Sequence, residues 1–452
     1  MTDQASAADR HHDPMSSDKR VLIIGLVVMV ALVAVGVVSA SLFAGSACRD
    51  IGPEPVAAPV AATQLEPVAV SLEVGDLEEH LNRLGADLAD AFGPLTGAAD
   101  VSGAVEVVPL GGGLAATGPL TVALDATGAE VVASASFDDP AQLVGSGARV
   151  YSLALMNELT GQVDALLPLE AGLEPGTCVD TAVVGDPFAF HLDAGGGELL
   201  LIRIEEDGEA PDLELRDPIR GQRWRAPLEV PVAPPGILAE RVTAALGDEL
   251  VVAARRVIPG EAQPAAVGTA RSDGERRWEL AAQDVLDEVG GDEPVWLEVA
   301  VVGDEVAVLA AAPERDRARA VLLLVDVSDG TILGVIEPGG GRAPVLDVHL
   351  GLGQVWVTWR DDAGVAVERY DIDEVALVAG GSWPGETSTI ADGVVLTSSR
   401  ILQPTGDGEV VEVARAADGL RFIDVVRVGD ATSVLVAVGD EHDVLLTFGG
   451  SG

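Results

Sequence analysis

An uninterrupted apolar run, Val21 to Ala44, stands at the start of the hydrophobic pattern and contains no charged residue. About 20 apolar residues in a helix cross the hydrocarbon core of a bilayer. The run therefore predicts a single transmembrane helix at residues 21–44. Because Lys19 and Arg20 precede it directly, the positive-inside rule predicts a cytoplasmic, disordered tail at 1–20 and an extracytoplasmic remainder.

Two alternatives to this anchor remain open. A cleaved signal peptide would be cut after Ala47, since Gly45 and Ala47 are both small, but its apolar core usually has about 7–15 residues. A lipidated Cys48 is the other alternative, although Gly45 occupies the position where such a signal usually has Leu.

Residues 45–70 are rich in Pro and Ala and predict a semi-extended linker, and 71–103 predict a helical lead-in. Within the lead-in, apolar residues recur every three or four positions and predict one short amphipathic helix from Asp76 to Phe92. Its apolar face consists of Leu77, Leu81, Leu84, Leu88 and Phe92. Asp76 and Glu79 suit an N-terminal cap, and Gly93-Pro94 ends the helix. We favour packing of this helix on the following domain over docking to a partner.

Residues 104–452 have a different pattern, in which short Val-, Leu- and Ile-rich runs alternate with Gly, Asp and Pro. Such runs between turn residues predict β-strands. Clear examples are 120–124, 199–204, 306–309, 321–326, 355–359, 394–397 and 434–438. Helical periodicity is nearly absent, with Trp278 to Val289 as the best exception. The region is therefore predicted to be all-β.

One unit recurs among these strands: an apolar strand, a turn with Asp that ends in Gly, and a second strand. Its marker glycines are Gly128, Gly161, Gly221, Gly274, Gly330 and Gly419, with a degenerate copy near Asp371. A period near 50 residues with four short strands is typical of a β-propeller. We therefore expect about seven four-stranded blades, with six or eight as alternatives.

Three units carry a more specific pattern. Asp217, Gly221 and Trp224 form one, Gly274 and Trp278 a second, and Asp326 and Gly330 a third. This pattern resembles the pyrroloquinoline-quinone-like (PQQ-like) propeller repeat. The resemblance implies a structural role for these residues, with the tryptophans packed between blades. In the enzymes of that family, carboxylates, amides and a stacking Trp hold quinone and calcium, often beside a pair of adjacent cysteines. This chain has no such pair.

The charge is strongly acidic, with 73 acidic against 27 basic residues and a net charge of −46. Such a surface repels nucleic acid and anionic lipid headgroups, which we exclude as partners. The two cysteines, Cys48 and Cys178, are a disulfide candidate because an exported location permits the bond. Two unpaired cysteines are the alternative.

No motif in the sequence names a reaction. His80, His191, His349 and His442 lie far apart, and no nucleophile elbow, phosphate loop or complete calcium loop occurs. We predict no catalytic, cofactor-binding or metal-binding residue and no cofactor. The sequence favours a membrane-anchored extracytoplasmic propeller that binds a protein or an envelope polymer, as similar non-enzymatic propellers do in envelope assembly. A quinone-dependent dehydrogenase and an extracytoplasmic sensor are the alternatives.

Overall fold

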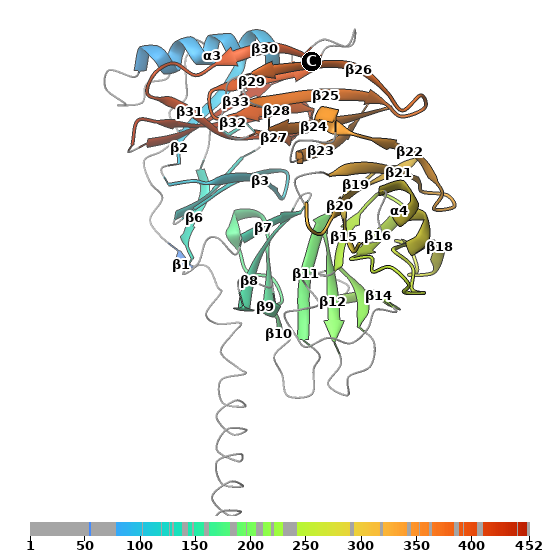
Figure 1. Ribbon diagram of the computed structural model, residues 1–452. Coiled ribbons are helices and arrows are strands. Elements are labelled where there is room, and N and C mark those ends of the chain that lie inside the picture. Colours follow the sequence, from blue (N-terminus) through green and yellow to red (C-terminus); the bar gives the residue numbers. More distant parts are fainter. Residues whose placement is uncertain are drawn as a thin grey trace, which may run out of the picture. The chain divides into compact units, whose positions relative to one another are not determined.

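The computed structural model describes residues 54–55 and, with interruptions, 78–449 (Figure 1). The interruptions fall at 102, 119, 126, 129–130, 138–142, 147–148, 158–161, 181–187, 196, 205–210, 218–220, 229–241, 290–292, 317–319, 341–344, 352, 361–363, 384–387, 392, 405–409 and 441. The predicted tail and transmembrane helix lie outside the described residues, as does nearly all of the predicted linker. No helix in the described part of the chain is both long and apolar enough to cross a bilayer.

The described strands form an all-β propeller, as predicted, but it has eight blades rather than seven. Each blade is a four-stranded antiparallel unit, and its first strand contacts the first strand of a neighbouring blade at most interfaces. Blade 1 contains β3 (Glu106–Leu110), β4 (Gly113–Thr117), β5 (Leu120–Leu124) and β6 (Val131–Ser136). Blade 2 contains β7 (Leu143–Ser146), β8 (Arg149–Asn157), β9 (Gln162–Leu169) and β10 (Val179–Asp180).

The next four blades follow the same order. Blade 3 contains β11 (Phe188–Gly195), β12 (Glu198–Ile204), β13 (Asp212–Asp217) and β14 (Gly221–Pro227). Blade 4 contains β15 (Val242–Leu246), β16 (Leu250–Arg255), β17 (Ala266–Ala270) and β18 (Arg276–Leu280). Blade 5 contains β19 (Val295–Val302), β20 (Val306–Pro313), β21 (Val321–Asp326) and β22 (Ile332–Ile336). Blade 6 contains β23 (Val345–Gly351), β24 (Gln354–Arg360), β25 (Val365–Asp371) and β26 (Ala376–Trp383).

The last blade combines both ends of the described chain. Blade 7 contains β27 (Ser388–Ala391), β28 (Val394–Thr397), β29 (Arg400–Pro404) and β30 (Val410–Arg415). Blade 8 contains β31 (Leu420–Val428), β32 (Ala431–Val438), β33 (His442–Gly449) and, as its outer strand, β2 (Leu95–Asp100). Blades 2 and 3 are joined in one sheet by pairing of β9 with β11, and β1 (Glu54–Pro55) adds to the outer edge of β6.

The seven-blade prediction is wrong because the marker glycines do not all occupy the same turn. Gly161 falls between the second and third strands of blade 2, and Gly419 falls between blades 7 and 8. None of the marker glycines falls between β29 and β30, the third and fourth strands of blade 7. Blade 8 has no such turn, because its fourth strand comes from 95–100, ahead of the predicted start of the propeller at 104.

Backbone and side-chain hydrogen bonds fasten this shared blade. β2 pairs with β33 from Leu95 opposite Phe448 to Asp100 opposite Val444. The Asp443 carboxylate accepts a hydrogen bond from the Gly103 backbone N–H at 2.6 Å. Closing a ring in this way removes two exposed strand edges, which would otherwise pair with other chains.

Helix α3 (Glu78–Phe92) lies across β30, β32 and β33 (Figure 1). Leu81, Leu84, Leu88 and Phe92 are buried in the core that it shares with blades 7 and 8. The predicted apolar face thus packs on the propeller, as favoured over partner docking. The second helix, α4 (Ala282–Val289), is shorter than expected, because Trp278 belongs to β18. Two 3-10 turns, η3 (Ala171–Leu173) and η4 (Pro338–Gly340), complete the elements of the described residues.

Candidate functional site

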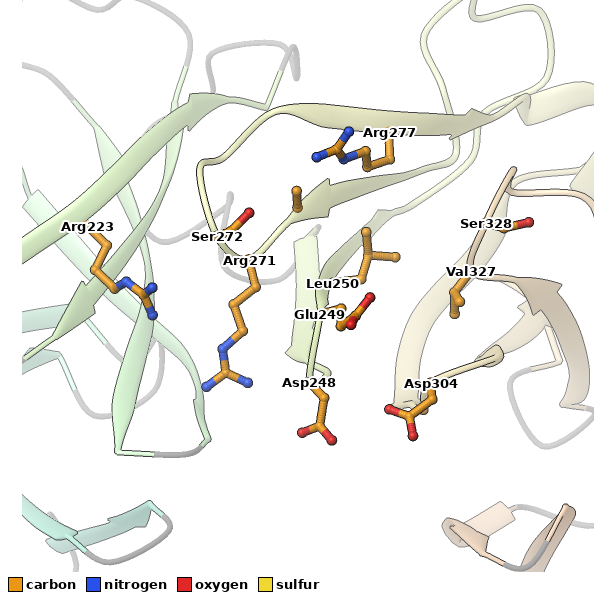
Figure 2. Close-up of a pocket in the computed structure, with 12 residues that line it drawn as sticks. Arg223, Asp248, Glu249, Leu250, Arg271, Ser272, Arg277, Asp304, Val327 and Ser328 are labelled. Atoms are coloured by element: carbon orange, nitrogen blue, oxygen red, sulfur yellow. The ribbon is translucent and has the colours of Figure 1, made fainter.

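A groove of about 710 Å³ crosses the turns of blades 3, 4 and 5 (Figure 2). In an antiparallel blade, the first-to-second and third-to-fourth turns lie at the same end of the strands. Blade 4 supplies Asp248 and Glu249 from one of these turns and Arg271 and Ser272 from the other, and blade 5 supplies the corresponding Asp304. Arg223 and Arg277 add side chains from the fourth strands β14 and β18. Turns from different blades thus place residues distant in sequence along one groove.

The turns of blades 4 and 5 that form the groove are near copies of each other. Gly-Asp-Glu occurs at 247–249 and again at 303–305. The Arg271 N–H donates to the Glu249 carbonyl at 2.9 Å, and the equivalent Val327 N–H donates to the Glu305 carbonyl at 3.0 Å. Because the backbone is held identically in both blades, the side chains at 271 and 327 distinguish them. Blade 4 presents an arginine where blade 5 presents a valine.

A buried carboxylate orients two arginines of this groove. Glu198, at the start of β12, is 5% exposed and forms ion pairs with Arg223 and, at 2.9 Å, with the Nε of Arg271. Arg271 also donates from Nη1 to the Gly247 carbonyl at 2.6 Å. Removing one partner from a buried ion pair costs about 3–5 kcal/mol, so the two guanidinium groups are held firmly in place. Their orientation is set before any ligand arrives.

The other side of the groove is acidic. In Figure 2, the side chains of Arg271, Asp248 and Asp304 extend toward the same open side, with the carboxylates beyond the guanidinium. Arg277 is half-exposed and pairs with Asp273 and Glu275 at 3.8 and 3.5 Å, contacts that contribute little at a surface. The groove therefore offers a rigid cationic end and an acidic end a short distance apart.

The motif tryptophans lie beside this groove and connect successive blades. Trp224 packs against Gly274 of the next blade and donates its indole N–H to the Arg271 carbonyl at 2.7 Å. Trp278 packs in the same way on Gly330 and donates to the Val327 carbonyl at 2.8 Å. Gly274 and Gly330 have φ values of +75° and +77°, and a Cβ on either would lie within 3 Å of an indole ring. The turn thus requires glycine for its conformation and for the close approach.

The next interface uses the opposite arrangement. Gly334 of β22 stands opposite Leu324, as Trp278 stands opposite Gly268 one blade earlier. It faces Val375, which occupies the turn position of Gly330 and has a φ of +51°. A Cβ on Gly334 would lie 2.7 Å from the Val375 side chain. A small residue on the strand is therefore paired with a large one on the turn.

The remaining predicted residues are structural neighbours of these turns. Asp217 pairs with Gly221 across the β13–β14 turn. Asp326 caps its own turn by accepting the Ser328 N–H at 2.7 Å, and hydrogen bonding to Ser328 lowers the pKa of Asp326. Cys178 is half-buried against the core between blades 1 and 2. Its bridge to Cys48 stays a prediction, because Cys48 lies outside the described residues.

The sequence predictions named none of the groove residues. They are spread over blades 3 to 5, and no short motif contains them. The repeated Gly-Asp-Glu was the available signal, since its two copies have the same spacing as Gly274 and Gly330. Within the described ranges, no group of three or more His, Cys, Asp or Glu side chains is close enough to hold a metal ion.

Comparisons with known proteins find similarity in fold. No protein-family model and no curated protein sequence matches the chain. The quinohemoprotein alcohol dehydrogenase of Comamonas testosteroni is 10% identical, with 78% of this chain and 76% of that chain covered and a TM-score of 0.45. BamB of Moraxella catarrhalis is 9% identical over 79% of this chain and 98% of that one, with a TM-score of 0.34. The β-propeller domain of the Pyrococcus furiosus Trilobed protease is 13% identical over 70% and 99%, with a TM-score of 0.39.

Proposed function

We propose that this protein is a membrane-anchored, extracytoplasmic β-propeller that binds a protein partner in the groove of blades 3 to 5. The observation that supports this most is the pair of arginines, Arg223 and Arg271, oriented by the buried Glu198. Arginine is enriched at protein interfaces, and a guanidinium that is already oriented loses little entropy on binding.

The shape and chemistry of the groove favour a polypeptide over a small molecule. Small-molecule sites are mostly apolar and enclosed, whereas this groove is lined by charged turn residues from three blades. A chain of net charge −46 repels acidic partners in general. Arg223 and Arg271 are a local exception to this repulsion, and a carboxylate of the partner can bind to them. Basic side chains of the same partner can pair with Asp248 and Asp304.

Photo-crosslinking from the groove tests this proposal. A photoreactive amino acid replaces Ser272 in the groove and, as a matched control, the exposed Asp418 between blades 7 and 8. We expect one protein adduct from position 272 that is absent from position 418 and is lost when Arg223→Ala and Arg271→Ala are added. Equal adducts from both positions, or an adduct indifferent to both arginine changes, would contradict binding in the groove.

An envelope polymer as the ligand, a sensor and a quinone-dependent dehydrogenase remain the alternatives. A polymer partner would give a glycan-containing adduct in the same experiment, whereas a sensor would require a cytoplasmic partner for the short tail. The dehydrogenase predicts reduction of a dye by the protein loaded with quinone and calcium.

The anchor is tested separately. Deletion of residues 21–44 should release the chain from sedimented membranes, and protease added to intact cells should digest the propeller but not the tail. Release of the unmodified chain from membranes by carbonate would instead indicate a peripheral protein. A mature N-terminus after Ala47 would indicate a cleaved signal peptide and a secreted protein. A lipid-modified Cys48 would show as a mass increase on the N-terminal peptide.

A further inference from the structure

The outer strand of blade 6, β26, has an edge with which no other described strand pairs. β26 pairs with β25 from Ala376 opposite Asp371 to Trp383 opposite Val365, and the sheet of blade 6 ends there. With eight residues, it is the longest of the described outer strands. An open edge presents a row of backbone N–H and C=O groups that can pair with an added strand.

β26 also lacks the charges that usually protect such an edge. Its sequence, ALVAGGSW, has no charged residue, although 22% of the whole chain is charged. The outer strands β14, β18 and β30 each carry at least two charged side chains. β22 is uncharged too, but it has only five residues, and Val375 of blade 6 packs against its Gly334. Because charged side chains prevent pairing at an edge, their absence leaves β26 open to it.

The same propeller already adds a strand to another uncharged edge. β6 of blade 1, VVASAS, has no charged residue, and β1 pairs with it from Glu54 opposite Ser136 to Pro55 opposite Ala135. This pairing is antiparallel, like that of β25 with β26. β26 is a second uncharged edge, two residues longer than β6, and the described part of the chain supplies no strand for it.

Apolar side chains are exposed near the start of β26. Leu377 is 56% exposed and Val378 is 46% exposed. Neighbouring residues of a strand point to opposite faces of the sheet, so both faces have an exposed apolar group here. An added strand would cover part of each group, because side chains of paired strands lie beside one another on each face.

The turn before β26 determines which charge the added strand should carry. Asp373 and Glu374 are exposed directly ahead of Ala376, and their N–H groups donate to the Asp371 carboxylate at 2.9 and 3.0 Å. A strand antiparallel to β26 would have its C-terminal end at this turn, where basic side chains can pair with the two exposed carboxylates. A second copy of this chain is disfavoured, because each copy has a net charge of −46.

We propose that β26 binds an extended segment of a partner protein as an added antiparallel strand. Main-chain hydrogen bonds to the edge would provide the affinity, as in other cases of strand addition. β-branched residues of the segment would contact Leu377 and Val378, and lysine or arginine at its C-terminal end would face Asp373 and Glu374. This site is independent of the proposed groove function.

Fluorescence anisotropy with the full-length protein in detergent tests the proposal with a labelled peptide, Val-Thr-Val-Thr-Val-Lys-Lys. A second peptide, Lys-Lys-Val-Thr-Val-Thr-Val, has the same composition and charge and should bind about tenfold weaker, since its lysines lie at the wrong end. Two further forms of the first peptide are N-methylated on alternate amides, one on the odd and one on the even positions. One form should bind about a hundredfold weaker, because it loses its hydrogen bonds to the edge, and the other should bind like the parent peptide.

Three variants locate the binding edge. Leu377→Lys and Val378→Lys should each weaken binding of the first peptide about tenfold, because they place a like charge beside it. Val132→Lys is the matched control, since Val132 is 58% exposed on β6, and it should leave binding unchanged. Each variant should keep the circular dichroism spectrum of the parent, because the replaced side chains are exposed.

Four results would overturn the proposal. They are failure of the first peptide to bind at millimolar concentration, equal binding of the two lysine placements, equal binding of the two N-methylated forms, and parental binding by Leu377→Lys. Sedimentation of the peptide-free protein examines the remaining occupant. A dimer that Leu377→Lys dissociates would assign the edge to a second copy and would also overturn the proposal, whereas a monomer supports a partner of different sequence.

Discussion

Exchanging the residues at the interface of blades 5 and 6 tests whether the strand residue and the turn residue act as a pair. The changes are Gly334→Trp, Val375→Gly and both together, which would give this interface the arrangement of Trp278 on Gly330. The turns are comparable, because Asp371 accepts the Asp373 N–H at 2.9 Å just as Asp326 accepts the Ser328 N–H at 2.7 Å.

The two single substitutions should change the free energy of unfolding by different amounts. Gly334→Trp places an indole where even a Cβ would lie 2.7 Å from Val375, and overpacking of this kind costs about 1–3 kcal/mol. Val375→Gly loses part of an apolar contact but relieves a non-glycine residue at φ +51°, a conformation that costs about 1–2 kcal/mol. We expect this second change to be close to neutral.

The double variant should then be more stable than the two single effects predict. The indole gains a surface at residue 375 and the Ile372 carbonyl as an acceptor, in the place that the Val327 carbonyl has for Trp278. Residues in contact show coupling of about 0.5–3 kcal/mol, and we expect about 2 kcal/mol here.

Urea denaturation of the full-length protein, followed by circular dichroism, measures this coupling from the midpoints and slopes of the parent and the three variants. The matched control is the cycle of Gly334→Trp with Thr432→Ser, a buried position in blade 8, which should show additive effects. Independent sites are additive to about 0.5 kcal/mol, so additivity of Gly334→Trp and Val375→Gly at that level would refute the pairing.

Three further predictions concern charge and cross-linking. Glu198→Gln should destabilise the protein by about 3 kcal/mol, because Arg223 and Arg271 lose a shared buried partner, and a urea midpoint equal to that of the parent would contradict the role of Glu198. Glu106 is exposed at the start of β3, but partial desolvation of its carboxyl, followed by the charge of Asp424, raises its pKa. The folded state therefore holds this proton more tightly than the unfolded state and loses stability as pH rises through the folded pKa. Glu106→Gln should therefore raise the urea midpoint at pH 7 and lose this advantage near pH 4, below the usual carboxyl pKa of about 4.3; a difference independent of pH would exclude this origin. Peptide mapping without reductant should find Cys48 linked to Cys178, and Cys178→Ser should lower stability by about 2–4 kcal/mol with no added effect of Cys48→Ser; two alkylated cysteines would disprove the bridge.

Local patterns predicted the strands well and the closure of the ring poorly. Strands at 120–124, 321–326 and 394–397 have the predicted bounds, because apolar runs and turn residues are adjacent in sequence. The eighth blade was missed because β2 pairs with β33 from the opposite end of the described chain, and no turn joins them. The groove was missed for a related reason: its residues become neighbours only when blades 3 to 5 are side by side.

The placement of β2 has a mechanical consequence. The strand that closes the ring lies near the N-terminal end of the propeller sequence, so tension applied to the chain from that end travels toward blade 8, which β2 closes through its pairing with β33 and through its buried residues Ala98 and Ala99. Helix α3 lies ahead of β2 in sequence, and Leu81, Leu84 and Leu88 root it in the core of blades 7 and 8. A pull therefore has to extract three leucines before it reaches the closing strand. The packing of α3 thus protects the closing strand from tension applied to the preceding chain.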